Sequence, residues 1–309
     1  MNTFQKQLSE KFEKPFLEIY QFAYSASRRY KTYNIPKRTG GNRIISQPSK
    51  ELKEYQRYLI TKVFSKFPIH ESVYSYQDGK NIKGMALNHV NKRFLLRVDF
   101  KSFFPSIKGE YIRGFLVKNI ELYELSLSKN DITLINMFVC KSNQLSIGAP
   151  SSPIISNILL YELDSYLSEI CTNLNIIYTR YADDMYFSTN QTNQLEKILP
   201  LLKEYLKSFY IKLVVNEDKN IFTSKKRRQI VTGLILTTDG NISVGKNKKR
   251  EIKSLIYQYI KQTISSADLN YLKGYLPYLY SIEPSYIDIL KRKYTEKIIC
   301  KLLPLKQDI

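Results

Sequence analysis

The sequence predicts an α+β fold in which a sheet-containing body carries further subdomains and ends in helices. Short β-rich runs alternate with helical stretches through most of the chain. Past residue 241 the chain turns helical and basic. The 309 residues, 43% of them hydrophobic and 13% aromatic, can bury a sizeable core. The chain is therefore predicted to be folded rather than disordered.

The N-terminal part is predicted to contain a helix, a hairpin and a second helix. Residues 10–30 have the character of a helix. A hairpin is expected over residues 35–47, because Gly40 and Gly41 stand at a turn between arms rich in Lys and Arg. Helical spacing resumes over residues 50–67.

Strands and helices alternate in the middle of the chain. The apolar run at 94–99 predicts a strand that ends on a carboxylate, Asp99. A helix is expected over 108–122. Another begins at Ser151, with a serine as its cap and Pro153 in its first turn, and its apolar positions as far as residue 170 fall mainly on one face.

The segment at residues 181–184 is predicted to be a bend between two β-rich runs, at 176–180 and 185–188. Beyond it, Pro200 starts or kinks a helix. This helix is expected over 202–209. Short strands are expected at 214–215 and 230–236, before the basic tail.

The charge of the chain predicts a polyanionic partner. There are 48 Lys and Arg residues against 28 Asp and Glu, which gives a net charge of +20. Such an excess attracts phosphates and releases their counterions, so nucleic acid is the expected partner. The alternative is solubility alone, but the lysines would then usually be balanced by more glutamates.

The cysteine and histidine contents argue against several other classes. Three widely spaced cysteines without a CxxC pair do not indicate a disulfide framework or a zinc module, and they fit a reducing cytoplasm. His70 and His89 cannot form a zinc site without a tighter cluster of ligands. Residues 1–10 lack the apolar core of a signal peptide, and no run of about 18 apolar residues occurs. A cytoplasmic protein without membrane contact is expected.

Three carboxylates are the candidate catalytic groups. Asp99 ends a hydrophobic strand, and Asp183 and Asp184 occupy the hairpin turn. Adjacent aspartates on an apolar hairpin repel each other and lose hydration, so they need a cation, and oxygen ligands suit Mg²⁺. Two such ions activate an attacking hydroxyl and neutralise a leaving pyrophosphate. The alternative is an exposed turn, where Asp is common.

Three motifs across residues 94–188 resemble those of reverse transcriptases. Tyr181-Ala182-Asp183-Asp184 matches the YxDD box, residues 97–107 resemble the first carboxylate motif, and residues 148–153 resemble the loop between the two. The resemblance implies RNA-directed DNA polymerase activity, in which a primer hydroxyl attacks the α-phosphate of a dNTP. It also implies a right-hand polymerase fold with fingers, a palm of antiparallel sheet and helices, and a helical thumb.

The resemblance narrows to the retron group. Val231-Thr232-Gly233 matches the VTG box of retron enzymes, and residues 86–89 match the end of their NAxxH box, with Met85 where Asn is usual. This implies a cognate structured non-coding RNA as template, priming from a guanosine 2′-hydroxyl, and a branched RNA–DNA product, msDNA. It further implies a role in anti-phage defence with a separate nuclease or toxin as effector protein. The implied parts are an N-terminal helical segment at 1–27, fingers at 28–92, palm at 93–240 and thumb at 241–309.

Catalytic roles are carried over from the family residue by residue. Asp99 and Asp183 would bridge two Mg²⁺ ions, with Mn²⁺ as a substitute, and Asp184 would support the site as a further metal-binding carboxylate. The backbone carbonyl of Phe100 would ligate one ion. Lys219 matches the lysine of the motif after YxDD and would protonate the leaving pyrophosphate or screen its charge.

The predicted hairpin and the loop near residue 148 supply candidate nucleotide contacts. Lys37, Arg38 and Arg43 are placed to clamp a triphosphate, Arg43 best by resemblance, and the alternative is a solvated charged hairpin. Gly148 begins the loop between the carboxylate motifs. Ile147 stands where the family usually has a Gln that contacts the incoming nucleotide, and an apolar side chain cannot make that hydrogen bond.

Phe104 lies five positions beyond the first catalytic aspartate. It resembles the aromatic gate that blocks a ribose 2′-hydroxyl. The alternative is a core aromatic, one of three phenylalanines at 100, 103 and 104.

Candidate contacts to RNA or primer lie near both retron boxes and in the tail. His89 ends one box, although such a histidine is more often packed and hydrogen-bonded, and Gly233 would let a backbone approach closely. Lys248, Lys249 and Arg250 enter a helix that would track phosphates as part of the thumb. The alternative for these three is a solvated charged face.

Two other functions remain open. One is another prokaryotic reverse transcriptase, such as a group II intron maturase, but those enzymes carry maturase and often endonuclease regions that this chain lacks. The other is a catalytically silent RNA-binding scaffold, against which the three intact aspartates argue.

Overall fold

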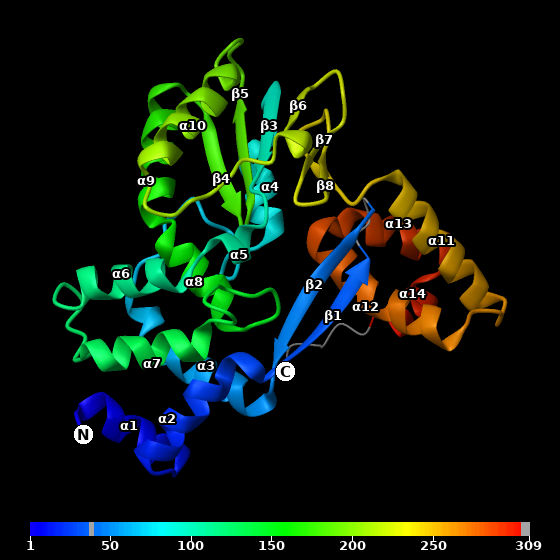
Figure 1. Ribbon diagram of the computed structural model, residues 1–309. Helices are drawn as coiled ribbons and strands as arrows, with labels where there is room; N and C mark the ends of the chain where they lie inside the picture. The colour runs from blue at the N-terminus through cyan, green and yellow to red at the C-terminus, as the bar shows by residue number, and fades with distance from the viewer. Residues whose placement is uncertain (37–39, 304–309) are drawn as a thin grey trace. The chain divides into compact units, whose positions relative to one another are not determined.

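Figure 1 shows the computed structural model of the protein, which describes residues 1–36 and 40–303. The chain folds into two compact units, each assembled from separate stretches of sequence. The first unit comprises Met1–Gly79, Leu96–Phe187 and Gln191–Ile221, and the second comprises Lys80–Leu95, Ser188–Asn190 and Phe222–Ile309.

The N-terminal segment of the first unit forms two helices. α1 (Thr3–Phe12) ends at Glu13, which has a left-handed φ of 50°, and α2 (Phe16–Ser25) begins directly after Pro15. The prediction of one helix over residues 10–30 is therefore wrong. Proline has no N–H to continue a helix but fits well at the start of one, so the chain breaks and restarts there. A 3₁₀ turn, η1 (Ala26–Arg28), follows.

An aromatic stack holds these helices to the rest of the first unit. Tyr55 of α3 (Lys50–Lys62) lies 4.6 Å from Phe138 of α7 (Lys129–Val139) and 5.1 Å from Phe22 of α2, measured between ring centroids. All three rings are buried, and such aromatic contacts add to the free energy gained by burial. α6 (Gly109–Asn119) packs beside α7, and the short α5 (Phe103–Ser106) precedes it.

The predicted hairpin is confirmed and begins earlier than expected. β1 (Tyr30–Pro36) pairs antiparallel with β2 (Asn42–Pro48) along its whole length. Gly40 and Gly41, in the turn, both have positive φ, which glycine adopts without strain. The helix expected over 50–67 is also confirmed, as α3 followed by the 3₁₀ turn η2 (Phe64–Lys66).

A four-stranded sheet positions the candidate catalytic residues. Its strands lie in the order β4-β5-β3-β6, and β3 and β5 each pass from one unit into the other. Their bounds are β3 (Phe94–Asp99), β4 (Ile177–Tyr181), β5 (Asp184–Thr189) and β6 (Ile221–Ser224). The predicted strand at 94–99 and the two strands flanking residues 181–184 are confirmed.

Helices of the first unit cover this sheet on one side. α9 (Tyr161–Asn173) packs against β4, and α10 (Ile198–Ser208) lies beside α9 (Figure 1). Tyr166 of α9 stacks on Tyr205 of α10 at 4.0 Å between ring centroids. Pro200 lies in the first turn of α10, so it belongs to the helix start and produces no kink.

Three sequence predictions in this region are wrong. The helix expected from 151 to 170 is two helices, α8 (Ser151–Leu159) and α9, with a break at Leu160, where ψ is 6°. No serine side chain caps α8; the hydroxyl of Ser152 instead donates to the carbonyl of Ser146 at 2.8 Å. The strand expected at 214–215 is only an isolated bridge between Val215 and Phe100.

The second unit begins with a small sheet and a helix packed on it. β7 (Gln229–Val231), β8 (Leu234–Leu236) and β9 (Ile242–Ser243) form an antiparallel sheet, which confirms strands over 230–236. α4 (Ile82–His89) packs against all three strands.

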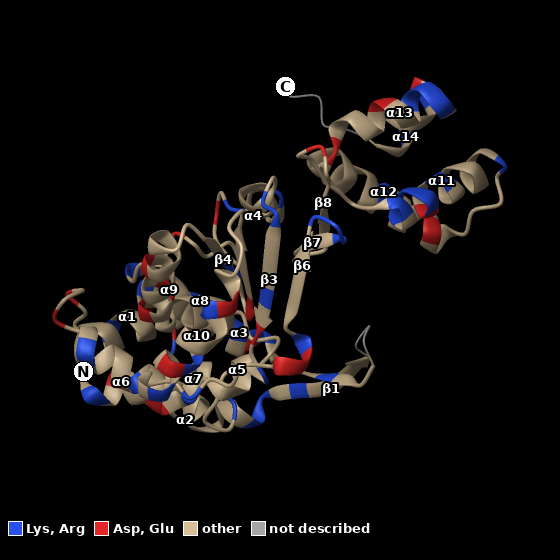
Figure 2. Cartoon of the chain, turned by 90° about the horizontal axis from the view of Figure 1, so that it is seen from above, with Lys and Arg blue, Asp and Glu red and all other residues tan. Residues whose placement is uncertain are grey.

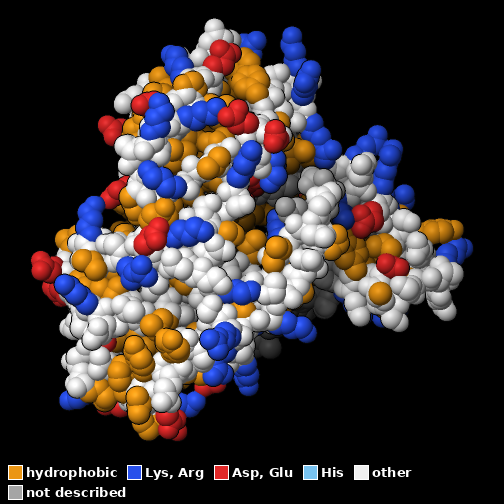
Figure 3. Space-filling view, viewed as in Figure 1, with side chains coloured by type: hydrophobic (Ala, Val, Ile, Leu, Met, Phe, Trp, Pro, Cys, Tyr) orange, Lys and Arg blue, Asp and Glu red, His pale blue; other side chains and the backbone are white. Residues whose placement is uncertain are grey.

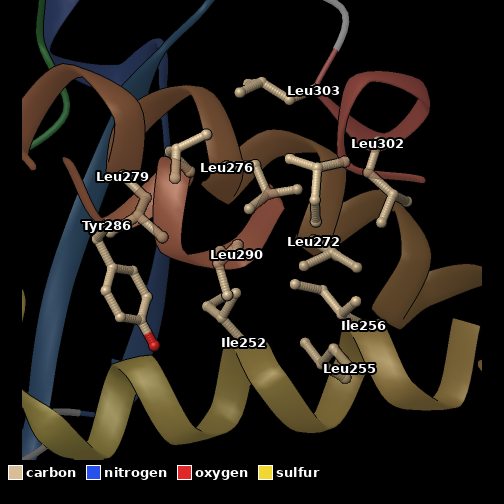
Figure 4. Packing of buried hydrophobic residues seen from close by; sticks show 12 residues of the cluster. Ile252, Leu255, Ile256, Leu272, Leu276, Leu279, Tyr286, Leu290, Leu302 and Leu303 are labelled. Atoms are coloured by element: carbon tan, nitrogen blue, oxygen red, sulfur yellow. The ribbon is translucent and has the colours of Figure 1, made fainter. Parts of the chain in front are cut away.

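The remainder of the second unit is the predicted helical tail. It contains α11 (Lys246–Ile260), α12 (Ser266–Ile282), α13 (Pro284–Tyr294) and α14 (Glu296–Leu302). These helices enclose their own apolar core (Figure 4), to which α11 contributes Ile252, Leu255 and Ile256. Within the described ranges, no helix has the length and apolar character needed to cross a membrane.

Candidate active site

The four-stranded sheet brings the three candidate carboxylates to neighbouring strand ends. Asp99 is the last residue of β3, and Asp184 is the first residue of the neighbouring strand β5. Ala182 and Asp183 form the tight turn between β4 and β5, and Ala182 has a left-handed φ of 54°. The turn is therefore sharp enough to present both aspartates beside the end of β3.

The three carboxylates interact electrostatically. Burial, followed by the negative charges of Asp184 and Asp99, raises the pKa of Asp183 to about 6. Burial likewise raises the pKa of Asp184, although the guanidinium of Arg97 opposes that rise. The turn thus concentrates negative charge that a bound cation would stabilise.

Arg97 is a residue of this site that the sequence analysis did not single out. Its Nε and Nη2 donate to the same oxygen of Asp184, at 2.9 and 2.7 Å. Arg97 and Asp99 are two positions apart on β3, so their side chains leave the same face of the strand. The spacing of Arg97 from the predicted catalytic residue Asp99 was the signal that could have identified it in the sequence.

Asp99 also binds two residues of the segment between α10 and β6. It is only 2% exposed, and its carboxylate accepts from Nζ of Lys219 at 3.1 Å and from Nδ2 of Asn216 at 3.3 Å. Its backbone carbonyl accepts from the N–H of Asn216 at 2.7 Å. Lys219, in the 3₁₀ turn η4 (Glu217–Lys219), is therefore placed directly at the carboxylate cluster.

These side chains fit a cation by charge and donor type. Within residues 1–36 and 40–303, no three His, Cys, Asp or Glu side chains are grouped closely enough to hold a metal ion as they now stand. Asp184 and Asp99 instead contact Arg97 and Lys219. The candidate ligands are all oxygens, which suit Mg²⁺.

A pocket of about 330 Å³ lies in the first unit beside Phe104 and Gly148. Phe104 lines the pocket, whereas Phe103 is buried with its ring 6.1 Å from that of Phe100. The lining also includes residues that the sequence analysis missed, namely Lys53, Arg57 and Tyr76. The basic pair is spaced i, i+4 on α3, a pattern that places both side chains on one helix face.

The loop at Gly148 closely approaches the hairpin. Gly148 has a φ of 111°, and a Cβ atom there would lie 3.0 Å from the carbonyl oxygen of Ser46. The N–H of Ser46 donates to the carbonyl of Ile147 at 2.8 Å. Glycine is therefore required by both its conformation and its contact. Arg43 lies exposed on β2, whereas Lys37 and Arg38 fall outside the described residues.

The retron-box residues lie in the second unit. His89 is fully buried, its Nδ1 lies 2.7 Å from the hydroxyl of Ser188, and burial lowers its pKa to about 3. This is the environment of a packed histidine. Val231 ends β7, and Thr232 and Gly233 form the turn to β8 with φ values of 47° and 85°.

The basic residues at the start of α11 differ in their partners. Lys248 donates to Glu251 and Tyr271, both at 2.8 Å, and Lys249 is paired with Glu283. Arg250 is exposed and makes no side-chain hydrogen bond or ion pair within the described part of the chain. Figure 2 marks the Lys and Arg positions along this helix, and Figure 3 shows basic side chains on the surface.

Comparisons with known proteins place the chain in a family. Residues 35–259 match the family model described as reverse transcriptase (RNA-dependent DNA polymerase). The chain is 37% identical to the retron Ec83 reverse transcriptase of Escherichia coli over 280 residues, which cover 87% of this chain and 88% of that protein. It is 34% identical to the retron Ec73 reverse transcriptase of the same organism, with the same two coverages.

Solved structures confirm the fold class. The telomerase of Candida albicans, in complex with a fragment of telomeric RNA, matches with a TM-score of 0.53 and 16% identity, over 90% of this chain and 61% of that one. Apo telomerase from Candida tropicalis matches with a TM-score of 0.52 and 12% identity, over 89% and 63%. The chain thus spans less than two thirds of these two proteins, and the likeness concerns the right-hand polymerase fold alone.

Proposed function

The chain belongs to the reverse transcriptase family and, within it, to the retron group, and from this premise we propose that it makes branched msDNA. It is an RNA-directed DNA polymerase. The proposed template is a cognate structured non-coding RNA, and the proposed primer is the 2′-hydroxyl of a guanosine in that RNA. The observation that carries the proposal is the identity to the retron Ec83 enzyme, which extends over most of both chains and far beyond the catalytic motifs.

Reverse transcriptases use divalent metal ions, and the proposed ligands here are Asp99, Asp183 and the carbonyl of Phe100. With Mg²⁺, or Mn²⁺ in its place, these residues would hold ions that lower the pKa of the attacking hydroxyl and neutralise charge on the leaving pyrophosphate. Burial, together with the charges of Asp184 and Asp99, raises the pKa of Asp183, and this clustering of carboxylates at adjacent strand ends supports the assignment. Asp184, held by Arg97, would keep the local charge and geometry fixed.

The remaining side chains of the first unit have proposed roles around the nucleotide. Lys219 would screen or protonate the pyrophosphate, which its contact with Asp99 supports. Phe104 would exclude a ribose 2′-hydroxyl from the pocket that it lines. Arg43, together with Lys37 and Arg38, would clamp the triphosphate.

We propose fingers at 28–92, palm at 93–240 and thumb at 241–309, after an N-terminal segment at 1–27. Lys248, Lys249 and Arg250 are the sequence-predicted candidate contacts to RNA phosphates; Arg250 is exposed and keeps that proposed role, whereas Lys248 and Lys249 are engaged by Glu251 and Glu283. The VTG turn would approach the RNA or primer backbone, whereas the burial of His89 supports a packing role. The retron resemblance is also the basis for proposing a cytoplasmic role in anti-phage defence with a separate nuclease or toxin.

The test is the chemical nature of the product in cells that carry the gene with its flanking DNA. The expected product is a short single-stranded DNA joined covalently to RNA. The join should survive denaturation and yield to an enzyme that cleaves 2′–5′ linkages. DNA joined only through a 3′–5′ linkage, or made only with an added primer, would rule out retron priming and leave the polymerase activity standing.

A further inference from the structure

Hydrogen bonds fix both the N–H and the carbonyl of Ala182, the residue that precedes Asp183 in the turn. Ala182 has a left-handed φ of 54°, a conformation that costs free energy for any residue with a side chain. Its N–H donates to the hydroxyl of Ser75 at 2.9 Å, and its carbonyl accepts from Nη1 of Arg180 at 3.0 Å. Side chains from outside the turn therefore maintain a backbone conformation that the turn alone would not favour.

Arg180 connects this turn to two helices. It is fully buried, and its Nε and Nη2 bind the two carboxylate oxygens of Asp164 in α9 at 2.7 and 2.6 Å. Its Nη1 also donates to the side-chain oxygen of Asn157 in α8, at 3.2 Å. Only a planar guanidinium supplies donors in this number and fixed geometry, so lysine cannot replace it.

Ser75 completes the network from a separate segment. Its carbonyl accepts from Nδ2 of Asn157 at 3.0 Å, and the N–H of Arg180 donates to the carbonyl of Ser72 at 2.9 Å. The next residue, Tyr76, also has a left-handed φ, 57°, and lines the pocket beside Phe104. Segment 72–76 therefore joins the catalytic turn to the wall of the proposed nucleotide pocket.

We propose that Arg180 and Ser75 are positioning residues for DNA synthesis. They hold the Ala182 peptide so that the carboxylate of Asp183 stands in one fixed place relative to the pocket. Displacements of about 1 Å in such a site are enough to reduce rates by two orders of magnitude. The inference rests on the proposed use of Asp183 as a metal ligand, and it adds the network that sets the position of that carboxylate.

Ser75→Ala is the decisive variant. Replacing Arg180 would leave the carboxylate of Asp164 buried and unpaired, which weakens the whole unit and obscures any local effect. Ser75→Ala removes one hydroxyl acceptor and no charge. Ser72→Ala is its matched control, because Ser72 is also buried in the same segment but its hydroxyl contacts Nδ1 of His70, at 2.9 Å.

The first measurement is hydrogen exchange at the Ala182 amide. Exchange should be faster in Ser75→Ala than in the parent and should be unchanged in Ser72→Ala. Mn²⁺ binding, followed by electron paramagnetic resonance without substrates, should weaken only in Ser75→Ala. In primer extension, kcat should fall about tenfold in Ser75→Ala with a smaller change in KM for dNTP.

Parent-like Mn²⁺ affinity and kcat in Ser75→Ala would overturn the positioning role, even with faster exchange at Ala182. So would equal losses in Ser72→Ala, since they would reflect general destabilisation. Persistent synthesis by Asp183→Asn would instead remove the metal assignment, and it would leave the exchange result at Ala182 unaffected. The two failures are therefore distinguishable.

Discussion

Phe103 and Phe104 are adjacent in sequence but occupy different environments. Phe103 is buried next to Phe100, and Phe104 faces the pocket. Replacing Phe104 by Val should open space for a 2′-hydroxyl and raise ribonucleotide incorporation by about tenfold or more relative to dNTP. Single-nucleotide kinetics with dNTP and rNTP measure this ratio.

Phe103→Val is the matched control for sugar selection. It should lower the free energy of unfolding, because it leaves a cavity, without changing the preference for dNTP. Unchanged discrimination in Phe104→Val, or a change only in Phe103→Val, would mean that Phe104 is not the gate.

His89 should make stability depend on pH. Burial lowers its pKa in the folded protein to about 3, whereas an exposed histidine titrates near 6.5. Between these values the unfolded chain binds one more proton, so stability falls as pH decreases through this window, by up to about 1.4 kcal/mol per pH unit. Urea unfolding of the parent and His89→Gln from pH 7 to 5 should show a shallower slope for the variant.

The chain has one other histidine, His70, and His70→Gln serves as the control. It should retain more of the parent's pH dependence than His89→Gln does. Equal slopes in the parent and His89→Gln would show that the buried imidazole does not set this dependence.

At the residue scale, motif resemblance predicted more than local pattern did. It singled out Lys219 for a role at the leaving pyrophosphate, and in the structure Nζ of Lys219 lies 3.1 Å from the carboxylate of Asp99. It did not identify Arg180 or Ser75, because their roles depend on partners in other segments of the chain. Ser75, for example, meets Ala182 across 107 positions. Such pairs follow from the path of the chain and not from any spacing.

At the element scale, the basic residues of α11 differ in whether an acidic residue binds them. Its apolar residues pack into the core of the second unit. Lys249 is held by Glu283 and lies over the ring of Tyr286, whereas Lys246 and Arg250 are exposed. The sequence could not separate these roles, because Glu283 lies between α12 and α13, 34 positions after Lys249.

Replacing Lys246 and Arg250 together by Gln should therefore weaken RNA binding. Two lost phosphate contacts should lower the slope of log affinity against log salt by about 2, since each contact releases about one counterion. Filter binding or fluorescence titration at several salt concentrations measures it.

Lys249→Gln should mainly lower stability, because it leaves Glu283 without its cation and with only the hydroxyl of Ser243 donating to it. If Lys249→Gln reduced the slope of log affinity against log salt as much as the double variant does, Lys249 would also contact RNA. That result would contradict the separate roles given to these residues. An unchanged slope in the double variant would remove α11 from the RNA-binding surface.

Element boundaries were predicted less well than element types. The strands around the catalytic turn, the hairpin and the helical tail agree with their patterns. The breaks at Pro15 and Leu160 were missed, because apolar spacing continued across both positions. Periodicity shows which face is buried, and it does not show where the chain changes direction.

At the scale of the whole molecule, charge and motif together identify the activity. The net charge of +20 predicted a nucleic-acid partner, and family membership is consistent with an RNA template. Composition alone could not predict that the chain forms two discontinuous units. The boundaries between these units fall within strands such as β3 and β5. That organisation depends on which strands pair, and pairing is non-local.

The most direct test of the central claim is primer extension on an RNA template by the parent, Asp183→Asn and Asp218→Asn, with RNA affinity measured in parallel. Asp218 is an exposed carboxylate, so both variants lose one negative charge. Asp183→Asn should lose at least about a thousandfold in rate and keep the parent's RNA affinity, because that affinity comes from distributed positive charge. Asp218→Asn should resemble the parent in both measurements. Appreciable synthesis by Asp183→Asn would contradict the assignment of the catalytic site.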